Sequence, residues 1–340
     1  MIPRLAVFLA FAGLLHAETQ DLIYVSGKSS GGGSAREQTL HALRATGLKP
    51  KQILNTTAYL TDAKDLPEVD LGYRAFFGKE FPARTVLVAG LPTPGALVEI
   101  SATAARKSSA RRLIRPAFPA SAAAEVGGTL YLSAMRASGA NVEQQTEQLM
   151  KDQEAVLSAA GFSFSDLVLS KIYLAEPGGY AALNEVYKRF VTAPPPARAT
   201  IHAGAVRPGE LLQVQSIAVR GSGAGRPSGE GHTSPIHSYS VKAGRRLYIT
   251  GMTGRAPDGK FAPEIGGQTR QALAMIAEQL QRNGMGFQDV VETTVWLRDL
   301  RDYDAIRAAI PDSGARTVVQ IPPTAIEALV EIQMVAEVYM

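Results

Sequence analysis

The sequence predicts an α+β protein that consists of three copies of one unit. A short stretch centred on an arginine recurs three times, at residues 82–85, 196–199 and 314–317. Each arginine is followed after the same interval by a residue inside an apolar, strand-like run, because 99 − 84, 213 − 198 and 331 − 316 all equal 15. Connecting segments usually vary in length, so a constant interval indicates that both of its ends have defined positions.

Each unit is expected to begin with a strand that is followed by a helix. The strand ends in a small hydroxyl residue in all three copies, namely Ser26, Ser133 and Thr250. Apolar residues then recur at helical spacing, most regularly at residues 273–280 of the third copy. A glycine, which often terminates a helix, follows in each copy, and these glycines are Gly47, Gly161 and Gly284.

The second half of each unit is expected to form a strand, a second helix, the arginine stretch and a last strand. Second helices are predicted at residues 66–77, 180–190 and 303–310. The strand at 53–60 and the one at 85–89 should be parallel neighbours that are joined by a right-handed crossover. This alternation predicts a mixed sheet with helices on one of its faces.

An additional front strand is predicted at residues 120–126 and 237–243, but the first copy has almost no sequence after residue 17 for one. The copies also differ in length. From the first strand to the glycine there are 21 residues in copy one, 28 in copy two and 34 in copy three, because 47 − 26, 161 − 133 and 284 − 250 give these values. Copy one is therefore expected to lack loop, about two helical turns, or both. The interval from Gly284 to Arg316 is 32 residues, against 37 in the other copies, so the second helix or the loop after it should be shorter in copy three.

These patterns divide the chain into five segments: a signal peptide at 1–17, unit 1 at 18–108 (trimmed at its start), unit 2 at 114–220, a linker at 221–233 and unit 3 at 234–340. Residues 107–113 form a short basic joint. The linker is rich in Gly, Ser and Pro, which predicts flexibility. A glycine-rich run can instead hold a phosphate, but no GKS or GKT sequence follows this one.

The first 17 residues have the pattern of a secretory signal. Arg4 supplies the positive start, residues 5–15 form the apolar segment, and Ala17 is a suitable last residue before cleavage. A transmembrane anchor is the alternative, but about eleven apolar residues are too few to cross roughly 30 Å of hydrocarbon. The mature protein is therefore expected to be exported, either periplasmic or secreted, without a membrane anchor.

Composition excludes several classes of function. The net charge is +4 over 340 residues and the basic residues are scattered, so nucleic acid is not an expected partner. The chain has no cysteine, which excludes disulfides, thiol catalysis and cysteine-bound zinc. None of the five histidines forms an HxxxH or HExxH pair, and therefore no metal site is expected.

The repeated motifs resemble those of the RidA/YjgF/YER057c/UK114 family, whose members are also labelled endoribonuclease L-PSP. In copy one they are LIYVSG, NTTAYLTD, YRAFF and FPARTVLVAGLP followed by VEISATA, and the resemblance covers nearly all of residues 20–340. It implies chorismate-mutase-like (RidA-like) units that assemble as a trimer around an inner, barrel-like core, with sites between neighbouring subunits. Because this chain already carries three units, it is expected to be a monomer that forms an intramolecular pseudo-trimer.

The resemblance also implies an activity, namely the hydrolysis of 2-imino or 2-enamino acids to 2-keto acids and ammonia without a cofactor. The family's arginine binds the substrate carboxylate, for which a guanidinium is well suited. The matching residues are Arg84, Arg198 and Arg316. The alternative is a structural ion pair between the arginine and the glutamate fifteen residues later, which is Glu99 for Arg84 and Glu331 for Arg316.

The family's acidic residue activates the attacking water, and it corresponds to Glu99 and Glu331. The second copy has Gln213 there, which cannot accept a proton at neutral pH. Arg84 with Glu99 and Arg316 with Glu331 are therefore candidate active sites, whereas Arg198 with Gln213 is expected to bind without turnover. Residues from different copies can complete one another, so the pairing of units stays open.

Further site residues follow from the resemblance. The hydroxyl at the end of the first strand is a usual site residue and corresponds to Ser26, Ser133 and Thr250. An asparagine on the second helix corresponds to Asp70, to Asn184 and, less securely, to Arg307. A front-strand aromatic corresponds to Ala120 in copy two and to His237 in copy three, which are two departures from the family pattern.

The leading interpretation is an exported imine or enamine deaminase that acts on a small carboxylate-bearing substrate. The alternative is a non-catalytic protein that binds small carboxylates at the same sites. A ribonuclease is less well supported, because the sequence has no paired histidines, no lysine-rich groove and no aromatic platform for stacking bases.

Overall fold

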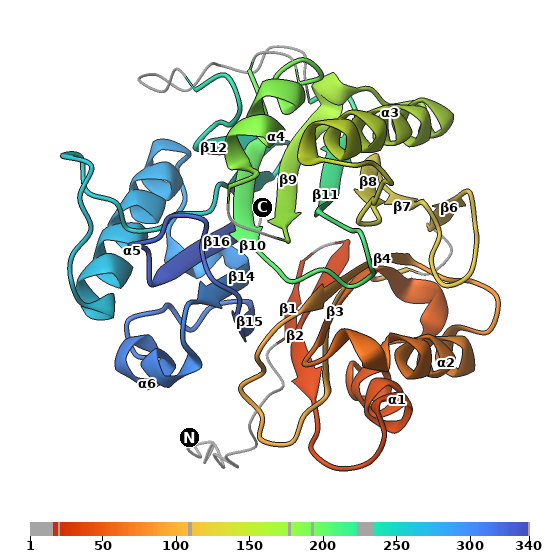
Figure 1. Ribbon diagram of the computed structural model, residues 1–340. Helices are drawn as coiled ribbons and strands as arrows, with labels where there is room; N and C mark the ends of the chain where they lie inside the picture. The colour runs from red at the N-terminus through yellow and green to blue at the C-terminus, as the bar shows by residue number, and fades with distance from the viewer. Residues whose placement is uncertain are drawn as a thin grey trace, which may run out of the picture.

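Each of the three units contains one mixed sheet with helices on one face. The computed structural model describes residues 16–19, 21–107, 111–175, 178–191, 194–222 and 234–338. The helices lie on the outside and the sheets toward the middle (Figure 1). The predicted α+β class with three similar units is confirmed. In the part of the chain that is described, no helix is both long and apolar enough to cross a membrane.

The sheet of unit 1 has the strand order β1-β2-β5-β3-β4. Its strands are β1 (His16–Glu18), β2 (Leu22–Ser29), β3 (Ile53–Leu60), β4 (Ala83–Val88) and β5 (Val98–Ala105). Helices α1 (Ala35–Ala45) and α2 (Leu66–Phe77) pack on one face of this sheet. Apolar side chains from both helices and from the strands form one continuous core there.

Units 2 and 3 repeat this arrangement. Unit 2 contains β6 (Arg112–Ile114), β7 (Ala123–Val126), β8 (Thr129–Leu132), β9 (Leu167–Leu174), β10 (Ala197–His202), β11 (Leu212–Val219), α3 (Val142–Ala160) and α4 (Tyr180–Tyr187). Unit 3 contains β12 (Ser240–Ala243), β13 (Arg246–Ile249), β14 (Val290–Leu297), β15 (Ala315–Gln320), β16 (Val330–Glu337), α5 (Ile265–Arg282) and α6 (Tyr303–Ile306). The strand orders are β10-β9-β11-β8-β7-β6 and β12-β13-β16-β14-β15.

The predicted differences in length are confirmed. Helix α1 has 11 residues, whereas α3 has 19 and α5 has 18, so unit 1 lacks about two helical turns. Helix α6 has only four residues, against 12 in α2 and eight in α4. The predicted parallel pairing is also confirmed, between β3 and β4 and between their counterparts in the other units.

One expectation about strands was wrong, and one further strand was not expected. Unit 1 does have a front strand, because β1 pairs antiparallel with β2 and places His16 opposite Val25. Three residues are enough to extend the ladder, and the strand uses Ala17, which was assigned to the signal peptide. The basic joint is likewise ordered at its end, where β6 pairs with β7. Residues 1–15, 108–110 and 223–233 lie outside the described residues.

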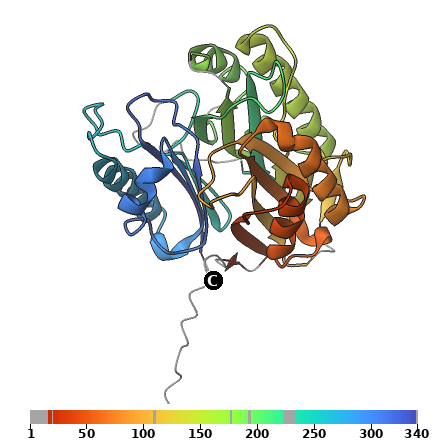
Figure 2. The same ribbon diagram turned by 60° about the horizontal axis from the view of Figure 1, so that its bottom comes forward.

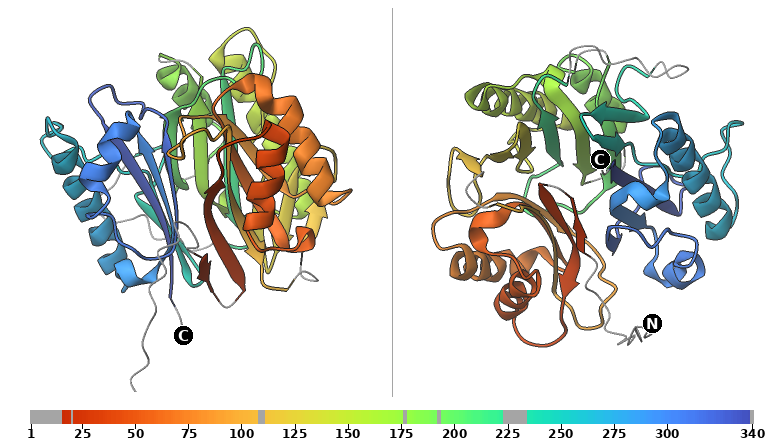
Figure 3. Two further views of the ribbon diagram at one scale, coloured as in Figure 1. Left: turned by 90° about the horizontal axis from the view of Figure 1, so that it is seen from below. Right: turned by 180° about the vertical axis from the view of Figure 1, so that it is seen from behind.

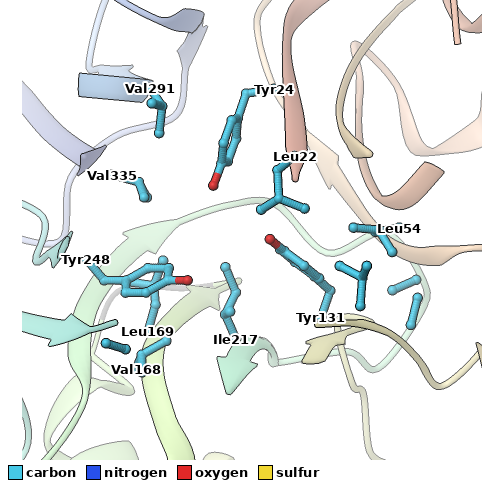
Figure 4. Packing of buried hydrophobic residues seen from close by; sticks show 14 of the residues in the cluster. Leu22, Tyr24, Leu54, Tyr131, Val168, Leu169, Ile217, Tyr248, Val291 and Val335 are labelled. Carbon is cyan, nitrogen blue, oxygen red and sulfur yellow. The ribbon is translucent and has the colours of Figure 1, made fainter. Parts of the chain in front are cut away.

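The inner faces of the three sheets share one core. Tyr24, Tyr131 and Tyr248 occupy equivalent positions in β2, β8 and β13, and their side chains point toward one another (Figure 4). A second shared cluster contains Tyr59, Tyr173 and Trp296, together with residues of β4, β10 and β15. The outward position of the helices is clear from other directions (Figures 2 and 3). The uncovered face of each sheet is therefore buried by the other two units, as an intramolecular pseudo-trimer requires.

A buried arginine links all three units. The guanidinium of Arg246, in unit 3, donates to Asp21 of unit 1 (2.6 Å), to Thr129 of unit 2 (3.4 Å) and to Glu337 of its own unit (2.8 Å). Arg246 is only 8% exposed, so these bonds form where water competes little. Charge-assisted bonds of this kind fix the relative position of the units, on which any site between them depends.

A glutamine that recurs in all three units fixes the loop before the last strand of each unit. The amide of Gln38 donates to the Gly95 carbonyl (3.2 Å) and accepts from the Leu97 amide (2.7 Å). Gln145 makes the same bonds to Gly209 and Leu211, and Gln268 makes them to Glu327 and Leu329. This loop leads into the strand that carries Glu99, Gln213 or Glu331, so the glutamine helps to position that residue. The recurrence of Gln-Thr at 38–39, 145–146 and 268–269 was visible in the sequence but was not used.

Candidate active site

The arginine and the acid of one unit lie on opposite faces of the same sheet. Arg84 on β4 is opposite Thr56 of β3, and Glu99 on β5 is opposite Tyr59 of β3. Positions 56 and 59 differ by an odd number, and successive side chains of a strand point to opposite faces. Arg84 therefore lies on the helix side and Glu99 on the inner side. The pairing of Arg84 with Glu99 within one site is wrong, and the same registers exclude the other two same-unit pairs.

Each arginine instead meets the hydroxyl residue of the next unit. The amide of Arg84 donates to Oγ of Ser133 (2.9 Å), that of Arg198 donates to Oγ1 of Thr250 (3.2 Å), and that of Arg316 donates to Oγ of Ser26 (2.9 Å). Three junctions result, which we call junction 1/2, junction 2/3 and junction 3/1 after the units that meet there. Ser133 and Thr250 also donate their hydroxyl hydrogens to backbone carbonyls, so they connect units whether or not a substrate is present.

Junction 2/3 combines a held arginine with a buried acid. Arg198 is 5% exposed, and its guanidinium donates to Asn184 (2.7 Å) and Thr200 (2.8 Å). Its Nη1 has no hydrogen-bond partner in the described part of the chain. Glu331 of unit 3 is 3% exposed. Burial raises the pKa of Glu331 to about 8, and the nearby Arg198 and the Thr200 amide oppose this rise only in part. A glutamate with this pKa can exchange protons near neutral pH.

The asparagine and the tyrosines of α4 hold Arg198 in place. Helix α4 presents Asn184 to the guanidinium, and the ring of Tyr187 lies 5.0 Å from its carbon, close enough for a cation–π contact. Burial lowers the pKa of Arg198, and the neighbouring Tyr187, Tyr180 and Glu331 counteract this effect. The group stays a cation at any physiological pH, because an arginine pKa is far above that range.

Junction 3/1 contains Arg316, Ser26 and Glu99, but its arginine is held differently. Its Nη2 donates to the Pro311 carbonyl (2.6 Å) and to Asp312 (3.3 Å), because the four-residue α6 offers no equivalent of Asn184. Arg307, the suggested equivalent, is exposed. Burial raises the pKa of Glu99 to about 7, while a hydrogen bond from Ser29 and the charge of Lys28 act in the opposite direction.

Junction 1/2 lacks the acid. Gln213 lies there, and its amide donates to the Val86 carbonyl (3.0 Å) and to Glu210 (2.7 Å). Arg84 forms an ion pair with Asp70 (2.5 Å), so Asp70 replaces the asparagine as the group that holds the arginine. A pocket of about 50 Å³ opens beside Arg84, and Ala120 lines it as the sequence suggested. His237, the corresponding residue of unit 3, precedes strand β12 and forms a hydrogen bond with Ser234 (3.0 Å).

The chain matches the sequence model described as Endoribonuclease L-PSP at residues 7–106, 113–220 and 231–338. It belongs to the endoribonuclease L-PSP family. It is 42% identical over 79 residues to "Protein DfrA" of Myxococcus xanthus, a match that spans 23% of this chain and 60% of that protein. It is 31% identical over 111 residues to the "2-iminobutanoate/2-iminopropanoate deaminase" of Mus musculus, which spans 30% of this chain and 82% of the relative.

One solved structure resembles the whole chain. A chorismatase crystal structure is similar with a TM-score of 0.60 over 94% of this chain and 100% of that one, at 15% identity. At this identity the likeness shows the fold alone. The predicted membership of this family is confirmed, and so are the three tandem units.

Two glycines in this L-PSP family chain make room for the acids, and sequence reasoning missed them. A Cβ atom at Gly27 would overlap the carboxylate of Glu99, and one at Gly251 would overlap that of Glu331. Unit 2 has Ala134 at the equivalent position, directly after Ser133, and its junction is the one in which glutamine replaces the acid. The glycines directly follow Ser26 and Thr250, so their recurrence only in these two copies was a usable signal.

No metal site accompanies these junctions. Within the described ranges, no group of three or more histidine, aspartate or glutamate side chains is arranged to hold a metal ion. Junctions 2/3 and 3/1 each offer a guanidinium that can bind a carboxylate, together with a carboxyl group whose raised pKa lies near neutral pH.

Proposed function

We propose that this protein hydrolyses small 2-imino or 2-enamino acids to 2-keto acids and ammonia, with its best-formed site at junction 2/3. The observation that carries the proposal is that Arg198 and Glu331, from different units, are buried in one junction, where the Arg198 amide donates to Thr250 and the Glu331 carboxylate lies against Gly251. The names of relatives from Mus musculus and Homo sapiens, both 2-iminobutanoate/2-iminopropanoate deaminases, support the same reaction.

Arg198 would bind the substrate carboxylate through Nη1, to which no described residue is hydrogen-bonded. A guanidinium can bind a carboxylate strongly, and the binding energy orients the imine carbon for attack. Asn184 and Thr200 keep the guanidinium in one orientation. Holding the arginine before substrate arrives reduces the entropy that binding costs.

Glu331 would act as the general base and then as an acid. In its ionised form it accepts a proton from water as the water oxygen bonds to the carbon of the protonated imine. The amino group of the tetrahedral intermediate takes up that proton from Glu331 and leaves as ammonia, while the hydroxyl group gives its proton to Glu331 and becomes the carbonyl. Ammonia then accepts this proton and departs as ammonium, which returns Glu331 to its ionised form. One water is consumed, and one 2-keto acid and one ammonia (or ammonium) are released. The sequence of transfers needs a carboxyl group whose pKa is near the working pH.

Junction 3/1 is a second candidate site for the same reaction, because Glu99 is buried beside Gly27 and its pKa is raised in the same way. Its arginine is held by backbone carbonyls rather than by an amide side chain. We therefore expect weaker substrate binding there than at junction 2/3.

The test is ammonia release from 2-iminopropionate that an amino acid oxidase generates in situ, measured above the spontaneous rate. Wild-type protein should accelerate release, and Arg198→Ala combined with Arg316→Ala should abolish the acceleration. Wild-type protein that gives no acceleration, although its circular dichroism shows a folded chain, would rule out the proposed reaction on this substrate.

We also propose that the protein is exported, on the basis of Arg4, the apolar residues 5–15 and Ala17. N-terminal sequencing of the protein recovered from the producing cell tests this. A mature chain that begins at or near residue 18 supports export, and a chain that retains residues 5–15 contradicts it.

A further inference from the structure

The pocket at junction 1/2 contains a buried guanidinium with two unused donors. Arg84 is 4% exposed, its Nη1 pairs with Asp70, and its ring contact is Tyr73 at 3.9 Å. Its Nε and Nη2 atoms have no hydrogen-bond partner among the residues that the structure describes. These two nitrogens lie on one edge of the guanidinium and match the two oxygens of a carboxylate. Buried donors without a partner are costly, so a ligand at this edge would be stabilising.

Two further arginines line the same pocket. Arg136 has 29% of its side chain exposed and lies 3.8 Å from Glu210, which is too far for a hydrogen bond. Arg207 is exposed and also contributes to the lining. Three arginines and one acid, Asp70, give the lining of this pocket a formal charge of 3 − 1 = +2, and Glu210 lies beside Arg136 outside the lining. A ligand with a single carboxylate bound to Arg84 would offer no second negative group to Arg136 and Arg207.

These outer residues are specific to unit 2. The repeats place Ser29 and Thr253 where unit 2 has Arg136, and they place Thr93 and Ala325 where it has Arg207. Unit 2 is also the copy in which glutamine, at position 213, replaces the acid. Two added cations and a missing general base therefore occur together at one junction.

The volume of the pocket limits what it can enclose. About 50 Å³ corresponds to roughly three to five water molecules, since one probe-sized water takes about 10–15 Å³. One carboxylate and its neighbouring carbon atoms fill this space. The remainder of a larger ligand would extend toward Arg136 and Arg207.

We propose that junction 1/2 binds a small dicarboxylate without transforming it. One carboxylate occupies the Nε–Nη2 edge of Arg84, and the second is bound by Arg136 and Arg207. Gln213 donates both of its described hydrogen bonds to protein acceptors and supplies no base, so the bound molecule is held rather than hydrolysed. The site is separate from the proposed hydrolysis at junctions 2/3 and 3/1, and its test does not depend on that activity.

Isothermal titration calorimetry with succinate and with butyrate tests the proposal, because the two probes have the same number of carbons but differ by one carboxylate. Wild-type protein should bind succinate at least tenfold more tightly than butyrate. The preference should fall to about threefold or less in the double variant Arg136→Gln/Arg207→Gln. It should also be lost in Arg84→Ala, whose folding is checked by its melting temperature. The matched control Arg270→Gln, an exposed arginine on α5, should keep the full preference.

Three outcomes would overturn the proposal. Succinate that binds no more tightly than butyrate, or not at all, shows that no second carboxylate is recognised. A preference that persists in Arg136→Gln/Arg207→Gln places the dicarboxylate elsewhere. Inorganic phosphate that binds at junction 1/2 more tightly than succinate identifies a phosphate site instead.

Discussion

Arg198 of unit 2 and Glu331 of unit 3 meet at one junction, whereas Arg198 and Gln213, which are fifteen residues apart in the same unit, lie on opposite faces of one sheet. The two residues that a constant interval of fifteen separates in each unit therefore belong to two different junctions. Each unit supplies the arginine to one neighbour and the acid, or its glutamine replacement, to the other.

Double variants test this cross-unit pairing. Arg198→Ala with Glu99→Gln damages both acid-containing junctions, so 2-iminopropionate hydrolysis should fall by about 100-fold or more toward the uncatalysed rate. Arg198→Ala with Glu331→Gln damages only junction 2/3, and the activity of junction 3/1 should remain. Initial rates of ammonia release distinguish the two variants. If the first variant kept about as much activity as Arg198→Ala alone, the arginine and acid would not be shared in this way.

The activity should rise with pH. The carboxylate form of Glu331 is the base, and its pKa is about 8, so the proton must leave before this glutamate can activate water. Glu99, with a pKa of about 7, should become active at lower pH. The kcat/KM profile of Arg316→Ala should therefore follow a group near 8, and that of Arg198→Ala one near 7. Identical profiles for these variants would contradict the assignment of one acid to each junction.

Stability should change with pH in the opposite direction. The pKa of Glu331 is raised by folding, from 4.5 to about 8, so the folded state binds this proton more tightly than the unfolded state. Its contribution to stability is complete below pH 4.5 and is lost as the pH rises through 8. Melting temperatures between pH 5 and 9 should fall less steeply for Glu331→Gln than for wild type. If the melting temperature of Glu331→Gln fell as steeply as that of wild type or more so, ionisation of Glu331 would not destabilise the folded protein.

Restoring an acid at junction 1/2 should destabilise the protein. In Gln213→Glu a carboxylate would face two acceptors, the Val86 carbonyl and Glu210, in place of a donating amide. Loss of two buried hydrogen bonds and the added repulsion should cost about 2–4 kcal/mol, most of all at high pH. Urea unfolding measures the change, and Gln281→Glu, an exposed substitution on α5, is the control. An unchanged free energy of unfolding would show that Gln213 is free to rotate away from both acceptors.

Alanine at Gly27 and Gly251 should remove activity without unfolding the chain. Each new methyl group overlaps the carboxylate that the glycine accommodates, so Glu99 and Glu331 must move. Displacing a catalytic group by about 1 Å can reduce the rate on the order of 100-fold. The double variant Gly27→Ala/Gly251→Ala should show this loss in kcat/KM, while Gly266→Ala on α5, where a methyl group meets only the tip of Arg270, should not. Full activity in the double variant would mean that neither carboxylate acts from its present position.

The sequence alone determined the repeated unit and the order of its elements. Apolar periodicity and the glycines that follow the first helices gave the helices and strands, with α2 predicted at its observed limits. The chain lengths between equivalent residues predicted the short α1 and the short α6. These are local properties, because hydrogen bonding and side-chain spacing within one element decide them.

Only the tertiary structure decided which residues share a site. Sequence distance could not show that Arg84 faces Gln213, because a strand directs alternate side chains to opposite faces and the partner of each face comes from another unit. The three-residue β1 and the arginines that gather beside Arg84 were missed for the same reason, since each depends on residues that are distant in the chain. The fold of each unit follows from its own residues, whereas its chemistry depends on the neighbour that closes the junction.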